Sequence, residues 1–234
     1  MKGSEKMLKV VKVIPVIKEK IEIDQYIPIK IRWVPIEESA GKLIYWRTGD
    51  LKKSMLEIGL SAVSGDLCSL TVVDIDILFF TSEKHVKGVS CEEGTPVFDV
   101  SNWIGKMTVD DIGLFEVRCY DKSLDMVISK NEIDREIISG RVSFGLDTDM
   151  NVCMISVNDL SDDEIFQIKD TMEHDCGLLV YEGIEPAGDK NSKTDMTRSD
   201  VGVESAGQKH HGFFGEVFAR CKKILRFFGK KRSS

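Results

Sequence analysis

Among the residues that could do chemistry, Asp74 and Asp76 come first because they alternate within an apolar run. In a strand both carboxylates would point to one face, as a metal site or an acid–base pair requires. No histidine is placed beside them by a recognisable motif, and adjacency of two histidines in the tail is not zinc-site spacing. The histidines are His85, His174, His210 and His211. We therefore expect solvated acids, with no metal and no other cofactor.

The segment from Asp147 to Asn151 imitates the first half of a calcium-binding loop. Such a loop needs glycine where Val152 stands and a bidentate glutamate where Asn158 stands. We interpret the segment as a hairpin turn between residues 141–146 and 152–157, because Asp and Asn tolerate left-handed backbone.

The six cysteines are spread singly without a C-x-x-C pair, which predicts reduced thiols. Lysines interrupt the apolar residues at the N-terminus and no small-residue cleavage site follows, so we expect no signal peptide. No apolar run reaches the roughly 20 residues that span a bilayer. These features predict a cytoplasmic protein.

Period-2 alternation of apolar residues dominates the chain and predicts strands, many of them paired as hairpins. The stretch Leu43–Leu78 is the expected centre, with a hairpin that joins Met55–Leu60 to Leu67–Val73. Residues 82–95 are expected to form a loop, and Ser161–Glu164 is a capping box that opens a helix to about Met172. Further strands are expected at 8–17, 18–24, 28–33, 42–46, 97–100, 113–120, 126–129 and 177–181. The fold class is therefore α+β, mostly β: an antiparallel sheet built from hairpins with one or two helices, plus a separate C-terminal amphipathic helix.

Composition divides the chain into three parts: a β-rich globular domain (1–181), a flexible linker (182–208) and a basic amphipathic helical tail (209–234). The tail has eight basic residues and one acidic residue, whereas the whole chain has a net charge of -7, so the body is acidic. Apolar tail residues recur at helical spacing with basic residues around them, which favours an anionic membrane surface, a protein partner, or the chain's own acidic body as the contact. The tail residues expected to make this contact are Phe213, Phe214, Val217, Phe218, Arg220, Lys222, Lys223, Leu225, Arg226 and Phe228.

Three segments, Ile27–Trp33, Tyr45–Leu51 and Ser54–Leu60, resemble small bacterial proteins of the toxin-immunity type. The resemblance lies within residues 1–181 and rests on structural residues, so it carries over no site residue. It implies a non-enzymatic binding protein that neutralises a protein toxin.

An acidic surface suits a basic toxin domain, because opposite charges accelerate encounter. The expected contact acids on the body are Asp74, Asp76 and Glu116. No nucleic-acid partner is expected. The alternative function is a membrane-peripheral adaptor, anchored by the tail at the inner membrane surface. A third alternative is an enzyme, which would need a pocket that gathers carboxylates, His85 and aromatic residues.

Overall fold

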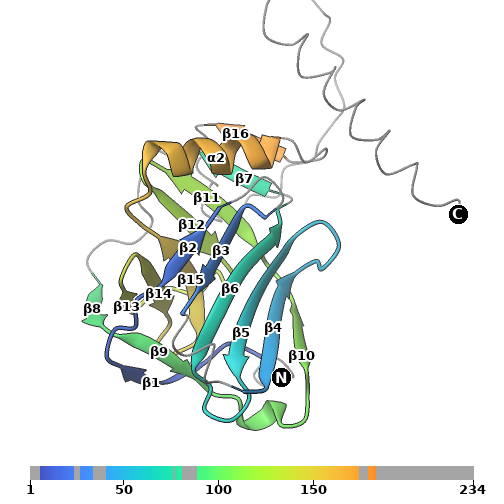
Figure 1. Ribbon diagram of the computed structural model, residues 1–234, viewed down its shortest axis with the longest axis vertical. Helices are drawn as coiled ribbons and strands as arrows, with labels where there is room; N and C mark the ends of the chain where they lie inside the picture. The colour runs from blue at the N-terminus through green and yellow to red at the C-terminus, as the bar shows by residue number, and fades with distance from the viewer. Residues whose placement is uncertain are drawn as a thin grey trace, which may run out of the picture. The chain divides into compact units, whose positions relative to one another are not determined.

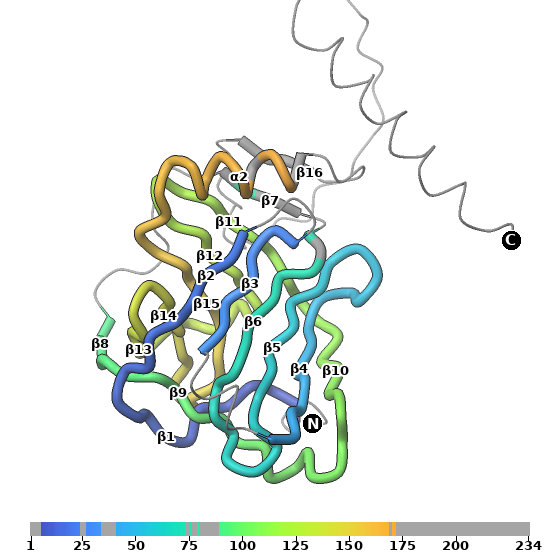
Figure 2. The backbone as a smooth tube through the Cα atoms, viewed as in Figure 1, coloured from blue at the N-terminus to red at the C-terminus, as the bar shows by residue number. Residues whose placement is uncertain are grey.

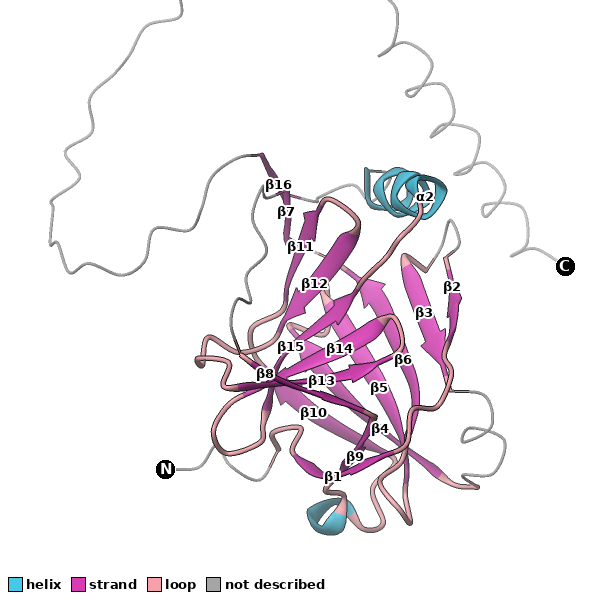
Figure 3. Cartoon of the chain, turned by 90° about the vertical axis from the view of Figure 1, so that its left-hand side faces the viewer, coloured by secondary structure: helices cyan, strands magenta, loops and turns pink. Residues whose placement is uncertain are grey.

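Alternating apolar residues build two β-sheets that face each other across one core (Figures 1 and 3). The computed structural model describes residues 6–23, 27–33, 41–75, 77–80, 89–173 and 179–182. The predicted linker after Glu182 and the whole predicted tail lie outside these residues.

One sheet has six strands and is antiparallel except at one edge, where β10 runs parallel to β4. In spatial order its strands are β10 (Thr108–Ile112), β4 (Leu43–Gly49), β5 (Met55–Ser61), β6 (Leu67–Asp74), β3 (Ile29–Arg32) and β2 (Lys20–Glu22).

The second sheet has eight strands, with antiparallel pairs in the middle and parallel pairs towards both edges. In spatial order they are β16 (Leu179–Glu182), β7 (Ile77–Phe80), β11 (Glu116–Tyr120), β12 (Ser123–Val127), β15 (Val152–Val157), β14 (Val142–Leu146), β13 (Arg135–Ser139) and β8 (Ser90–Glu93). A two-stranded ribbon of β1 (Val10–Ile14) and β9 (Thr95–Phe98) lies at one end of the sandwich (Figure 1).

Aromatic side chains tie the three sheets together. The ring of Phe144 on β14 lies 6.5 Å from the ring of Trp33, which follows β3, and 6.3 Å from the ring of Phe98 on β9. Trp46 and Trp103 are also buried in this core. The tryptophans therefore serve packing.

The helix α2 (Asp162–Glu173) lies across the other end of the sandwich, as Figures 1 and 3 show from two sides. Its capping box forms as predicted: the Glu164 amide donates to Ser161 Oγ at 3.2 Å, and the Ser161 amide donates to Glu164 Oε2 at 2.7 Å. Ile168 reaches the core and Ile165 packs against it. Their spacing places both on one face of the helix, so α2 buries an apolar stripe.

The local hairpins predicted from the sequence are confirmed. β5 pairs with β6, β11 with β12 and β14 with β15, all antiparallel. In the turn between β14 and β15, Asp147 accepts amide N–H groups from Asp149 and Asn151 and the side-chain N–H of Asn131. Both carboxylate oxygens of Asp147 thus accept hydrogen bonds from the protein itself. The segment is the hairpin turn that the sequence predicts.

Three expectations need correction. The sheets are mixed, not purely antiparallel, and the loop expected at 82–95 contains β8, which pairs in parallel with β13. All four β8 side chains are exposed, so no apolar alternation marks the strand; its pairing comes from the distant β13. The stretch Leu43–Leu78 also spans both sheets, because β6 ends at Asp74 and β7 begins at Ile77.

Candidate protein-binding surface

Of the three acids predicted to contact a partner, Glu116 is the one whose side chain the structure describes. Asp74 is the last residue of β6, and its side chain lies outside the described residues, as does the whole of Asp76. Glu116 begins β11, where Oε2 lies 3.1 Å from the Arg118 guanidinium. Its side chain is 17% exposed and that of Arg118 is 11% exposed. Glu116 is therefore an ion-paired and largely covered carboxylate.

The histidines, the tail residues and the cysteines are the other reactive or binding residues considered in the sequence. All four histidines and every tail residue named above lie outside the described residues. Cys68, Cys119 and Cys153 are buried thiols, and Cys91 is an exposed thiol. Across the described ranges, no group of three or more His, Cys, Asp or Glu side chains is arranged to hold a metal ion.

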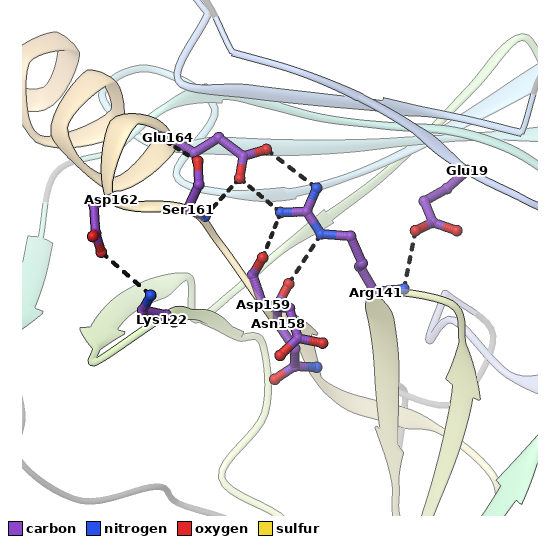
Figure 4. Close-up of polar contacts among 8 residues, drawn as sticks. All are labelled: Glu19, Lys122, Arg141, Asn158, Asp159, Ser161, Asp162 and Glu164. Carbon is purple, nitrogen blue, oxygen red and sulfur yellow. Dashed lines mark hydrogen bonds and ion pairs between the residues drawn. The ribbon is translucent and has the colours of Figure 1, made fainter.

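A polar cluster surrounds Arg141, at the turn between β13 and β14 (Figure 4). Its guanidinium donates to both carboxylate oxygens of Glu164, at 2.8 and 3.2 Å, and to the main-chain oxygen of Asp159 at 3.0 Å. The Arg141 amide donates to Glu19 Oε1 at 3.0 Å. Burial opposes the charge of Glu164, but the bonds from Arg141 and Ser161 outweigh it and hold the pKa of Glu164 below its usual range.

This cluster is a structural clasp. The bidentate arginine joins the β13–β14 turn to the first turn of α2, and Glu19 adds the strand region before β2. Each partner is supplied by the chain, and Lys122 extends the set with an exposed ion pair to Asp162 at 3.4 Å. Side chains that satisfy one another in this way hold elements together and leave little capacity for a ligand.

A different feature distinguishes β10. Large apolar side chains gather in and just before this strand, where Ile104, Met107 and Ile112 are 81%, 70% and 72% exposed. Figure 2 follows the chain from β9 past the lower end of the sandwich and up into β10, beside β4. Exposed apolar groups that cluster on one segment mark an interaction site more often than isolated ones do.

The backbone of β10 is also open on one side. Met107 O accepts a hydrogen bond from the Tyr45 amide at 3.0 Å, and the Gly113 amide donates to Gly49 O at 3.3 Å. These bonds bracket the strand, and main-chain groups in a parallel ladder alternate between its two sides. The N–H and C=O groups of residues 108, 110 and 112 therefore point away from β4, towards an edge where the described residues supply no further strand.

One contact confirms this direction. The exposed Lys6 Nζ donates to the main-chain oxygen of Asp110 at 3.0 Å, from the side opposite β4. The carbonyl groups of this edge are therefore accessible to donors outside the sheet.

Two adjacent acids occupy the centre of the strand. Asp110 lies on the outer face, where its Oδ1 accepts bonds from Arg47 Nε at 2.8 Å and Nη2 at 2.7 Å. Asp111 alternates to the other face with the buried Val109. Burial raises the pKa of Asp111 above its usual value, and Lys6 counteracts this only in part. Asp111 forms no ion pair with any described residue. We call residues Ile104, Met107, Thr108, Asp110, Asp111 and Ile112 the β10 edge.

Sequence reasoning overlooked this surface. Residues 108–112 contain two acids in succession, so the apolar alternation that reveals a half-buried strand is interrupted. The signals that were present are the glycines at 105 and 113, which bound a short segment with the β-branched residues Thr108, Val109 and Ile112.

Comparison with known proteins yields no family for this chain. No protein-family model matches the sequence, and no curated protein matches it significantly. Within the described residues, no helix is both long enough and apolar enough to cross a membrane.

Proposed function

We propose that this chain is a non-enzymatic binding protein of the bacterial toxin-immunity type, which neutralises a basic protein toxin by occupying it. The observation that carries the proposal is the β10 edge, where one segment carries three exposed apolar side chains and a row of outward main-chain groups. Apolar contact supplies affinity, and the main-chain groups supply direction.

Net charge supports a basic partner. The chain carries -7 overall, whereas residues 209–234 hold eight basic residues and one acidic residue, so the rest of the chain is acidic. Complementary charge raises association rates and discriminates against acidic competitors. An immunity protein benefits from both, because it has to bind the toxin before the toxin reaches its target.

The experiment is co-expression of the full chain with the products of neighbouring genes, followed by size-exclusion chromatography at low and high salt. We expect a stoichiometric complex with a basic protein, formed more slowly at high salt because screening weakens the steering. Recovery of no stoichiometric protein partner would end the proposal.

A pair of variants tests whether the toxin binds at the β10 edge. Ile112→Asp places a charge on the β10 edge, and Val63→Asp places the same charge in the turn between β5 and β6, where Val63 is even more exposed than Ile112. We expect Ile112→Asp to weaken binding at least about tenfold, as loss of a central apolar contact does, and Val63→Asp to leave it unchanged. Equal affinities for both variants would remove the β10 edge from the proposal.

The apolar stripe and basic residues of the segment 209–234 favour a second function, that of an adaptor held peripherally at the inner face of the cytoplasmic membrane. The two functions are compatible, since a membrane-bound immunity protein would meet a toxin at its point of entry.

A further inference from the structure

We propose that the β10 edge binds its partner by strand addition, in which an extended basic segment of the partner pairs with the outward main-chain groups of Thr108, Asp110 and Ile112. This inference rests on the proposed function, because it names the chemistry of the partner segment and the way in which it is held.

The geometry of the edge provides a ladder that is ready for pairing. The three residues with outward N–H and C=O groups alternate along β10, which is the spacing at which a neighbouring strand exchanges hydrogen bonds. Thr108 and Ile112 are exposed, and the described side chain that an added strand would displace is the exposed Lys6, whose Nζ donates to Asp110 O at 3.0 Å. The six-stranded sheet would thereby gain a seventh strand outside β10 (Figure 1).

The side chains of the edge specify a different requirement on each face. The outer face offers the exposed Ile112, and the opposite face offers Asp111. Neighbouring side chains on paired strands lie about 5 Å apart, close enough for direct contact. A partner segment with basic residues on the Asp111 face and apolar residues on the Ile112 face would satisfy both. Pairing with a cation would also favour the charged form of the half-buried Asp111 carboxylate.

A second copy of this chain fits the edge less well. In a symmetric antiparallel pairing centred on Asp110, the two Asp110 side chains would lie opposite each other, and like charges in that position are destabilising. The inward-pointing acid at Asp111 is also a feature by which edge strands discourage pairing with identical edges. A basic heterologous strand meets neither obstacle.

Two other described edges, those of β8 and β2, lack this combination. β8 exposes all four of its side chains, but none of them is a large apolar residue. β2 holds an ion-pair group in which Glu22 Oε1 contacts Arg32 at 2.6 Å and Lys20 at 2.8 Å. Of these three edges, β10 is the one that combines open main chain with large exposed apolar side chains.

The test uses a short peptide with blocked termini in which lysine and valine alternate, titrated into the isotope-labelled full chain and followed by NMR. We expect saturable shifts centred on residues 104–113. A matched peptide carries N-methyl groups on the amides of one edge, so that it keeps the side chains and loses the donors; we expect no saturable binding from it. Replacing the lysines by glutamates should also abolish binding.

A variant supplies the complementary test from the protein side. Thr108→Pro removes an N–H that points away from β4, so it costs the peptide one hydrogen bond and the sheet none. We expect peptide affinity to fall about fivefold, the effect of one typical backbone hydrogen bond. The N-methylated peptide leaves the protein untouched, so the test holds even where this variant folds poorly.

Three results would overturn strand addition: equal binding by the N-methylated peptide, equal binding by the glutamate peptide, or shifts that map elsewhere. Self-association through β10 without peptide would also overturn it, because the edge would then belong to a second copy. The proposed function fails separately. If Thr108→Pro leaves the affinity for the toxin unchanged, strand addition is excluded and the immunity function stands. If the peptide binds but no toxin complex forms, the immunity function is excluded and strand addition stands.

Discussion

Replacement of Gly65 by alanine tests how the central hairpin is fastened to the ribbon at the end of the sandwich. Gly65 lies in the turn between β5 and β6 with φ +74°, and its main-chain oxygen accepts a hydrogen bond from the Phe98 amide at 2.9 Å. A Cβ at this position would collide with the main-chain oxygen of Phe98, which belongs to β9. Backbone on both sides of the contact has to move.

The chain offers a matched control at Gly105. Its φ is +79°, nearly the same as at Gly65, but a Cβ there would meet no heavy atom within 4 Å. Gly105→Ala therefore measures the cost of left-handed backbone alone, about 1 kcal/mol. Gly65→Ala adds the displacement of β9 and the loss of one hydrogen bond, for a total loss of about 2 to 4 kcal/mol in the free energy of unfolding.

The assay is urea unfolding followed by fluorescence of the buried tryptophans, with circular dichroism as a second probe. We expect both variants to keep the wild-type dependence on urea, since neither changes the surface exposed on unfolding, and to differ in midpoint. Equal loss of stability in the two variants would refute the reasoning, because it would show that the turn does not press against Phe98.

Three further predictions concern the Arg141–Glu164 contact, the Asp50 carboxylate and the tail. Arg141→Lys keeps the charge but loses the bidentate contact with Glu164, so we expect a loss of about 1 to 2 kcal/mol by urea unfolding, and non-additivity with Glu164→Gln in a double-mutant cycle; additive losses would contradict the clasp. Amide groups of Lys52, Lys53 and Ser54 donate to Asp50 and lower its pKa from 3.8 to about 2, so the stability that Asp50 contributes is complete above about pH 4 and is lost as the pH falls through 2. The advantage of wild type over Asp50→Asn should shrink across that window in unfolding measurements, and a constant difference would argue against it. For the tail, we expect the full chain to sediment with anionic liposomes and a chain truncated before Lys209 to remain in solution; equal sedimentation would exclude membrane anchoring by this segment.

Sequence patterns alone determined the local units of this protein. Ile29 and Ile31 alternate with Lys30 and Arg32, and the apolar pair is buried while the basic pair is not. The hairpins follow from such alternation on both sides of a turn, and the helix α2 follows from its capping box. Each of these signals lies within a few neighbouring residues, where steric preference and hydrogen-bond capacity are set by residue type.

Tertiary structure decided which distant segments became neighbours. β8 pairs with β13, and β10 pairs with β4 across about sixty residues, in each case in parallel and without a connecting turn. Their pairing depends on how the two sheets close over a shared core, which no short window of sequence records. For the same reason the candidate surface became visible only in three dimensions. Whether Ile112 is buried or exposed, and whether the main-chain groups of β10 are paired or open, depends on which strand ends the sheet.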